Sequence, residues 1–119
     1  MKFNKIIILG GGMVGSAIAQ DLKKSGYFVT VADINVSLDK FYSNLCINFI
    51  KIDFTDSKQF HEVLKDYHLV IGAVPGFMGY EVLKEIILCG KNVVDISFMA
   101  EDSKNFDKLQ TIKKLSSYI

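Results

Sequence analysis

Three glycines near the start of the chain have the spacing of a phosphate-binding loop. Gly10, Gly12 and Gly15 follow a short apolar run and fit the pattern G-x-G-x-x-G. Glycine permits a tight turn, lets a phosphate approach the main chain and lets the next helix lie close to the strand. The amides of Met13 and Val14 would begin that helix, where unpaired N–H groups attract anions. The pattern therefore predicts a site for the diphosphate of a dinucleotide.

An acidic residue at the end of the second predicted strand extends this site. Asp33 follows the glycine loop at about the 20-residue distance at which a carboxylate binds the adenosine ribose hydroxyls. The alternative is that Asp33 only forms a turn before Asn35. The 2′-phosphate of NADP would be repelled by Asp33 and would need a base just beyond it, but residues 34–38 contain none. We therefore expect NAD in preference to NADP, with Lys40 as the nearby base that could reverse the choice.

Further candidates follow from topology, because ligands of a parallel α/β sheet bind beyond the carboxyl ends of its strands. Asp53 ends the third predicted strand and is placed to reach the adenine edge, although a turn or helix-entry role is an equal alternative. Val74 ends the fourth predicted strand, and Pro75 and Gly76 follow it. We expect these three residues to shape the floor near the nicotinamide ribose.

Other polar residues receive weaker assignments. Asp95 and Ser97 end the fifth predicted strand on the same edge, where they could approach the nicotinamide or a substrate. A hydrogen-bonded structural role for Asp95 and a capping role for Ser97 are the favoured alternatives. Neither His61 nor His68 falls at the carboxyl end of a strand, so we predict no catalytic residue in this chain.

Composition narrows the class of protein. The chain has 119 residues, of which 50% are hydrophobic and one is proline, and its net charge is +1. These values predict one globular domain over residues 1–119, with no basic stripe for nucleic acid or anionic lipid. No segment approaches the ~20 apolar residues of a membrane span. Cys46 and Cys89 lack a second Cys or His at ligand spacing, so we expect no metal and two buried, reduced thiols in a cytoplasmic protein.

The elements that must position these residues alternate regularly between strands and helices. Strands are predicted at residues 6–9, 27–33, 48–54, 68–74 and 92–97, and helices at 14–25, 37–41, 56–64, 77–89 and 101–116. The fourth strand is apolar without alternation, as expected where helices cover both faces of a parallel sheet. The pattern predicts an α/β fold: a Rossmann-like, doubly wound parallel sheet of about five strands, truncated before a sixth.

Four stretches resemble, in the same order, the N-terminal NAD(P)-binding domain of the saccharopine dehydrogenase family, including its lysine 6-dehydrogenase-like members. They are ILGGGMVGSAIAQDL, VTVADIN, IKIDFTD and GAVPGFMGYEVLKEIILCGKNVVDISFM. Many dinucleotide-binding folds share the first three stretches, whereas the fourth is distinctive of the family. The resemblance covers roughly residues 3–102 and is loose over the last helix.

The resemblance implies an NAD(P)-dependent oxidoreductase of lysine metabolism that acts on C–N bonds of amino acids, with hydride transfer at the carbon bearing the amine. It also implies a cofactor-binding role for each matching position. These are Gly10, Gly12, Met13, Val14 and Gly15 for the diphosphate, Asp33 for the ribose, Asp53 for the adenine side, and Ala73, Val74, Pro75, Gly76 and Ser97 for the nicotinamide side.

The sequence departs from the family pattern at its end. Family members continue into another strand and a separate substrate and dimerisation domain, which do not follow Ser116 here. We therefore expect cofactor binding without turnover, in a fragment, a truncated gene product or one chain of a split enzyme, with the amino-acid substrate bound only by a longer or split form. Apolar surface where a sixth strand should lie predicts a homodimer.

The alternative function is non-enzymatic. Nucleotide-sensing regulatory domains of the potassium-uptake type share the glycine loop and the acid at the end of the second strand, and they need only the binding half. The stretch from Pro75 to Phe98 argues against a sensor, which has no need of the family's nicotinamide-end sequence.

Overall fold

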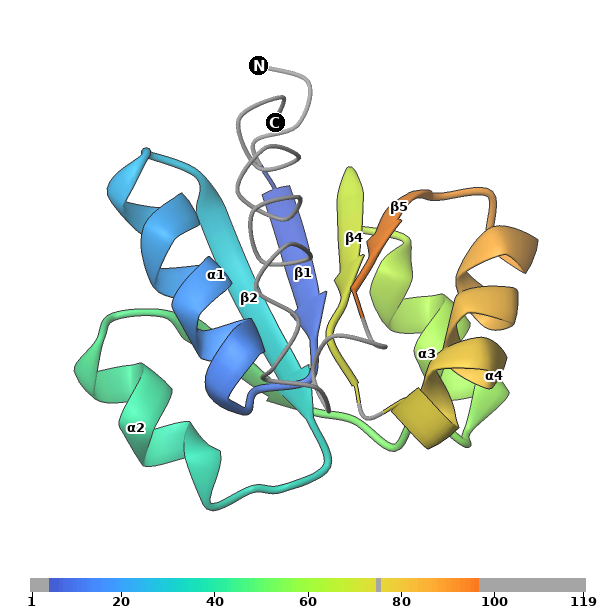
Figure 1. Cartoon of the computed structure of the whole chain (residues 1–119), viewed down its shortest axis with the longest axis horizontal. Helices are drawn as coiled ribbons and strands as arrows, with labels where there is room; N and C mark the ends of the chain where they lie inside the picture. Colours follow the sequence, from blue (N-terminus) through green and yellow to red (C-terminus); the bar gives the residue numbers. More distant parts are fainter. Residues whose placement is uncertain (1–4, 75, 97–119) are drawn as a thin grey trace.

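A five-stranded, fully parallel sheet forms the centre of the protein (Figure 1). The structure is a computed structural model and describes residues 5–74 and 76–96. The strands are β1 Lys5–Leu9, β2 Phe28–Asp33, β3 Asn48–Lys51, β4 Leu69–Gly72 and β5 Asn92–Asp95. Their order across the sheet is β3-β2-β1-β4-β5, which confirms the predicted doubly wound α/β fold for the part of the chain described.

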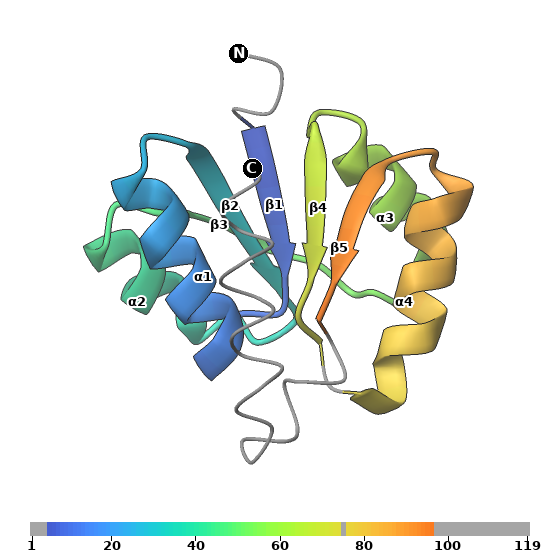
Figure 2. The ribbon, with the colours of Figure 1, turned by 45° about the horizontal axis from the view of Figure 1, so that its top comes forward.

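Four helices cover the two faces of the sheet. They are α1 Met13–Lys24, α2 Leu38–Asn44, α3 Ser57–Leu64 and α4 Gly76–Leu88. Figures 1 and 2 show α1 and α2 on one side and α3 and α4 on the other. In β1, Ile6 and Ile8 pack in the core under α1 and α2, and Ile7 and Leu9 pack in the core under α3 and α4. Both faces of β1 are therefore buried, which explains its unbroken apolar sequence.

The connections place a topological switch point at the carboxyl end of the central strand. Leu9 pairs with Ala32 of β2 on one side and with Gly72 of β4 on the other. The chain winds from β1 outward to β2 and β3, then crosses over to β4 and β5. Ligands of such sheets bind in the crevice at this point. The loops that follow β1, β2 and β4 therefore meet at the edge where the sequence places the site.

Several strands are shorter than predicted. The third strand ends at Lys51, although the Ile52 amide still donates to the Asp33 carbonyl oxygen at 3.0 Å. The next carboxylate, on Asp53, accepts from the Thr55 amide and hydroxyl, and these bonds turn the chain toward α3. The fifth strand ends at Asp95, and the predicted helix over residues 101–116 lies outside the described residues.

The prediction of two buried cysteines is wrong. Cys46 is exposed and has a φ of +58°, because it makes the tight turn between α2 and β3. Cys89 is half-buried near the end of α4. Burial raises the pKa of the Cys89 thiol, with the Glu85 charge acting in the same direction.

Candidate functional site

The N-terminus of α1 presents backbone amides without a capping side chain. Gly12 occupies the N-cap position, and the first turn holds no acidic residue. The first backbone bond of the helix runs from the Ser16 amide to the Gly12 carbonyl, at 2.8 Å. No described residue accepts a hydrogen bond from the amides of Met13, Val14 or Gly15. This arrangement suits an anion such as a diphosphate.

The glycines of the loop are required for different reasons. Gly10 has a φ of +103°, and a Cβ there would overlap the Ala73 carbonyl. A Cβ on Gly15 would overlap the Gly10 carbonyl, so α1 can lie against the loop only with glycine at this position. At Gly12, by contrast, a Cβ would meet nothing within 4 Å. Packing therefore demands Gly10 and Gly15, whereas Gly12 leaves open space beside the free amides.

Asp33 lies at the end of β2 and contacts the glycine loop directly. Its Oδ2 accepts from the Gly11 amide at 2.8 Å, and its Oδ1 accepts from the Asn35 amide at 2.9 Å. The second bond is the turn that the sequence suggested as the alternative, and the first joins the carboxylate to the loop. A carboxylate has about four acceptor positions, so Asp33 retains capacity for ribose hydroxyls.

The loop after β4 lies against the glycine loop. The Ala73 amide donates to the Leu9 carbonyl at 2.8 Å, and the Gly10 amide donates to the Ala32 carbonyl at 2.8 Å. Ala73 and Val74 are buried at this junction. The structure therefore brings the ends of β1, β2 and β4 together, as the predicted site requires. Gly76 begins α4, and the candidates Pro75 and Ser97 lie outside the described residues.

Asp53 belongs to a local turn. Its Oδ1 accepts from the Thr55 amide at 2.9 Å and from the Thr55 hydroxyl at 2.6 Å. These hydrogen bonds hold the pKa of Asp53 below its usual value. The turn role, one of the two alternatives from the sequence, is thus present, and a role beside adenine remains a prediction.

Sequence reasoning missed the part that Tyr42 plays at the site. This side chain is fully buried. Its hydroxyl also donates to the Gly11 carbonyl at 2.7 Å, which ties α2 to the glycine loop. Burial raises the pKa of Tyr42, with a hydrogen bond to the Ser16 side chain acting against it and the nearby Asp33 charge acting with it. The sequence did contain one signal: Tyr42 lies four residues after Leu38, so in a helix both side chains face the same way.

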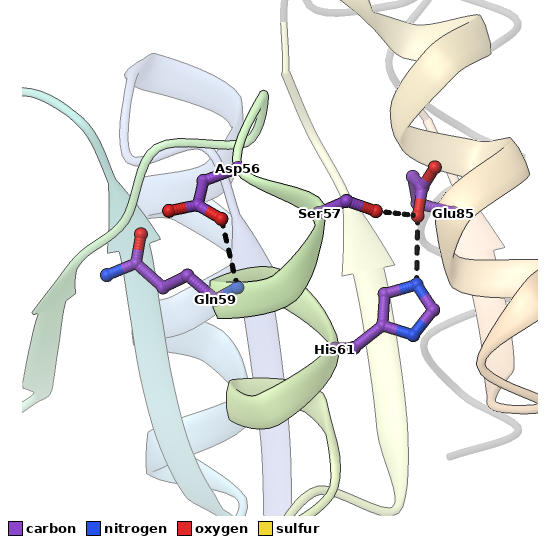
Figure 3. A network of polar contacts seen from close by, with 5 residues as sticks. All are labelled: Asp56, Ser57, Gln59, His61 and Glu85. Carbon is purple, nitrogen blue, oxygen red and sulfur yellow. Dashed lines mark hydrogen bonds and ion pairs between the residues drawn. The ribbon is translucent and has the colours of Figure 1, made fainter.

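The N-terminus of α3, at the same edge, has a capping side chain (Figure 3). Asp56 caps α3 by accepting from the Gln59 amide at 3.2 Å. Ser57 and His61 both contact Oε2 of Glu85 on α4, at 2.8 and 2.9 Å. The His61 side chain is 41% exposed and links two helices.

Two features are absent from the described residues. No group of three or more His, Cys, Asp or Glu side chains could hold a metal ion there. None of the helices in that part of the chain has the length and hydropathy needed to cross a bilayer. A groove of about 490 Å³ lies at the opposite edge of the sheet, lined in part by Lys23, Phe28 and Asn48.

Solved structures with the same arrangement include several dehydrogenases. Apo saccharopine dehydrogenase (L-Glu forming) from Saccharomyces cerevisiae matches with a TM-score of 0.61 and 24% identity, over 82% of this chain and 23% of that chain. A short-chain dehydrogenase/reductase from Veillonella parvula matches with a TM-score of 0.61 and 13% identity, over 78% and 46% of the two chains. UDP-glucose 4-epimerase from Thermotoga maritima matches with a TM-score of 0.59 and 19% identity, over 76% and 36%. At these identities the likeness shows the fold, and this chain spans about a quarter of the yeast protein.

Sequence comparison gives two results. No curated protein matches the chain significantly. A family model described as "Saccharopine dehydrogenase NADP binding domain" matches residues 6–117, which is nearly the whole chain. The match agrees with the resemblance noted in the sequence. The preference for NAD over NADP finds no support in it, because the description names NADP.

Proposed function

The chain belongs to the saccharopine dehydrogenase family, and from that membership we propose that it binds NADP(H) at the carboxyl edge of its sheet. The single observation that carries the proposal is the uncapped N-terminus of α1, beside Asp33 and the loop after β4. The family match and the free anion-binding helix end both support this ligand. For catalysis, we propose that a longer form of this chain or a partner chain supplies the substrate-binding residues.

Each part of the cofactor has residues suited to it. The amides of Gly12, Met13 and Val14 would hold the diphosphate, since they begin a helix whose dipole attracts negative charge. Asp33 would accept from the adenosine ribose. Ala73 and Val74 would lie near the nicotinamide end, together with Pro75, Gly76 and Ser97 of the predicted site.

The choice between the two dinucleotides sets two arguments against each other. Charge repulsion between Asp33 and a 2′-phosphate favours NAD, whereas the description of the family domain favours NADP. We give the family description more weight, because a charge contact at a half-exposed position can be relieved by a nearby base or by rotation of the carboxylate. Lys40, which is exposed on α2, is the base closest in sequence.

The reaction that we propose for the complete enzyme is oxidation or reduction at a carbon bearing nitrogen in an amino acid. The nicotinamide ring supplies hydride chemistry in such enzymes, and a protein contributes binding, orientation and exclusion of water. We propose that this chain contributes the cofactor half alone. Reduction of NADP by the 119-residue chain with lysine or saccharopine would contradict that part of the proposal.

Titration of the purified chain with NADPH and NADH, followed by nicotinamide fluorescence, tests cofactor binding. We expect saturable binding of NADPH with a larger dissociation constant for NADH. Binding of neither dinucleotide would overturn the proposed function. Tighter binding of NADH would keep dinucleotide binding and restore the preference that Asp33 suggested.

A pair of aspartate variants measures the charge effect at the ribose. Asp33→Asn should raise NADPH affinity relative to NADH, because it removes the charge that faces a 2′-phosphate. Asp53→Asn is the matched control, since Asp53 also accepts from a backbone amide two residues ahead, at 2.9 Å, and lies at the same edge. Equal changes in both variants would exclude a specific role for Asp33 in cofactor choice.

A further inference from the structure

The residue at the centre of the glycine loop is held from two sides. The Gly11 amide donates to Asp33 on β2, and the Gly11 carbonyl accepts from the Tyr42 hydroxyl on α2. A Cβ on Gly11 would lie 3.1 Å from the side chains of Val31, Leu38 and Tyr42. The G-x-G-x-x-G pattern treats this position as variable, yet the structure gives it more tertiary contacts than Gly12.

Holding the Gly11 carbonyl fixes the direction of the next amide. The peptide bond is planar and trans, so the Gly11 C=O and the Gly12 N–H point in opposite directions. Tyr42 is buried on the core side, and the Gly12 amide must therefore point away from the core. No described residue accepts a hydrogen bond from that amide.

The restraint matters because residues 10–12 are three consecutive glycines. Glycine samples more backbone conformations than any other residue, so rotation of the peptide between Gly11 and Gly12 would otherwise cost little. The Tyr42 ring is itself fixed, since it stacks on Phe49 with centroids 5.9 Å apart and meets Phe41 edge-on at 5.0 Å. The fixed Tyr42 hydroxyl thus orients the Gly11 carbonyl of an otherwise flexible loop.

We propose that Tyr42 is a positioning residue for dinucleotide binding, which orients the Gly11–Gly12 peptide so that the Gly12 amide faces the diphosphate. The inference rests on the proposed function for its ligand. It adds α2, which contains none of the glycine-loop residues, to the elements that determine cofactor affinity. It also explains why a tyrosine, and not another large apolar residue, occupies a buried position on α2.

The test compares two tyrosine-to-phenylalanine variants of the full chain. Tyr42→Phe removes the hydroxyl that reaches Gly11 and retains the stacked ring. Tyr67→Phe is the matched control, because Tyr67 is also buried and its hydroxyl donates to Thr30 Oγ1 at 3.0 Å, away from the loop. Both variants keep the aromatic ring in the core, and circular dichroism checks that both fold.

We expect Tyr42→Phe to weaken NADPH binding about tenfold, as for the loss of one hydrogen bond that orders a binding loop, and Tyr67→Phe to leave it unchanged. In the ligand-free protein, NMR should show altered Gly11 and Gly12 amide signals in Tyr42→Phe alone. Wild-type affinity in Tyr42→Phe, or equal losses in both variants, would overturn the inference.

The same experiment separates this inference from the proposed function. If the wild-type chain binds neither NADPH nor NADH, the proposed function fails, and with it the assignment of a ligand to the loop. The amide spectra then decide the remaining claim, that Tyr42 orients the Gly11–Gly12 peptide. Unchanged Gly12 signals in Tyr42→Phe would refute it.

Discussion

Of the helices that begin at the carboxyl edge of the sheet, α1 and α3 differ in what occupies the backbone amides at their N-termini. At α1 the N-cap is Gly12, and no side chain or first-turn acid meets the amides. At α3 the Asp56 carboxylate accepts from the Gln59 amide, and Ser57 contacts Glu85 of the neighbouring helix (Figure 3). One helix end is open to an external anion, and the other is capped by a carboxylate of the protein.

The difference shows that two helix N-termini in one fold can serve different purposes. Both helices have a partial positive charge at the N-terminus, because both have unpaired amides and aligned peptide dipoles. A capping carboxylate uses that charge for stability, whereas a glycine leaves it for a ligand. The residue at the N-cap position therefore determines whether the helix end is capped by the protein or left open to a ligand.

The largest expected effect comes from adding a side chain at Gly15, where α1 lies against the glycine loop. Gly15→Ala would place a methyl group against the Gly10 carbonyl, so it should destabilise the fold by about 3 kcal/mol and abolish dinucleotide binding. Urea denaturation and an NADPH titration measure the two effects. Gly12→Ala is the control and should change stability by less than about 0.5 kcal/mol, since no atom lies within 4 Å of its Cβ position. Equal stability of the two variants would contradict the packing argument.

A second change gives α1 the kind of N-cap found in α3. Gly12→Asp should raise stability by about 0.5 kcal/mol and weaken NADPH binding more than tenfold, because the carboxylate binds the amides and repels the diphosphate. Gly12→Asn separates the two causes, as it caps the amides without adding charge, and it should give a smaller loss of affinity. Unaltered binding by Gly12→Asp would show that the helix end is not the diphosphate site.

The reverse change opens α3. Asp56→Ala removes the cap and should lower the free energy of unfolding by about 1 kcal/mol, with no effect on NADPH affinity. Asp56→Asn should retain most of the stability, because asparagine caps helices nearly as well as aspartate. A loss of nucleotide binding in Asp56→Ala would mean that the α3 end takes part in the site.

The smallest effect concerns the contacts between α3 and α4. Hydrogen bonds from His61 and Ser57 hold the pKa of Glu85 below its usual value, so its contribution to stability is present above an unfolded-state pKa of about 4.3 and is lost as the pH falls through the folded-state pKa. Glu85→Gln should therefore lower Tm slightly near neutral pH, and the difference from wild type should vanish in acid.

Thermal denaturation at several pH values measures that difference. Glu62→Gln is the control, because it removes the same charge from an exposed pair between Glu62 of α3 and Lys65, the residue after that helix. A Tm difference for Glu85→Gln that persists unchanged into acid would argue against the ionised Glu85 as its source.

Much of the fold was predictable because its signals are local. Apolar runs, glycines at helix ends and periodic helices gave the order of strands and helices, and the predicted parallel sheet is confirmed for the described residues. Strand ends were less predictable: the third strand stops at Lys51 because Asp53 and Thr55 form a turn by side-chain hydrogen bonds. Cys46 was misassigned because its positive φ, which exposes it, depends on how α2 meets β3.

The site divides in the same way. Gly10, Gly12, Gly15 and Asp33 could be predicted from spacing, because phosphate binding by a strand–turn–helix unit depends on residues close in sequence. Only the tertiary structure showed that Gly11 is held by Asp33 and Tyr42. These residues lie 22 and 31 positions after Gly11 in the sequence. Sequence determines which backbone conformations and charges are available. Packing of distant segments decides which amides are occupied and which remain open to a ligand.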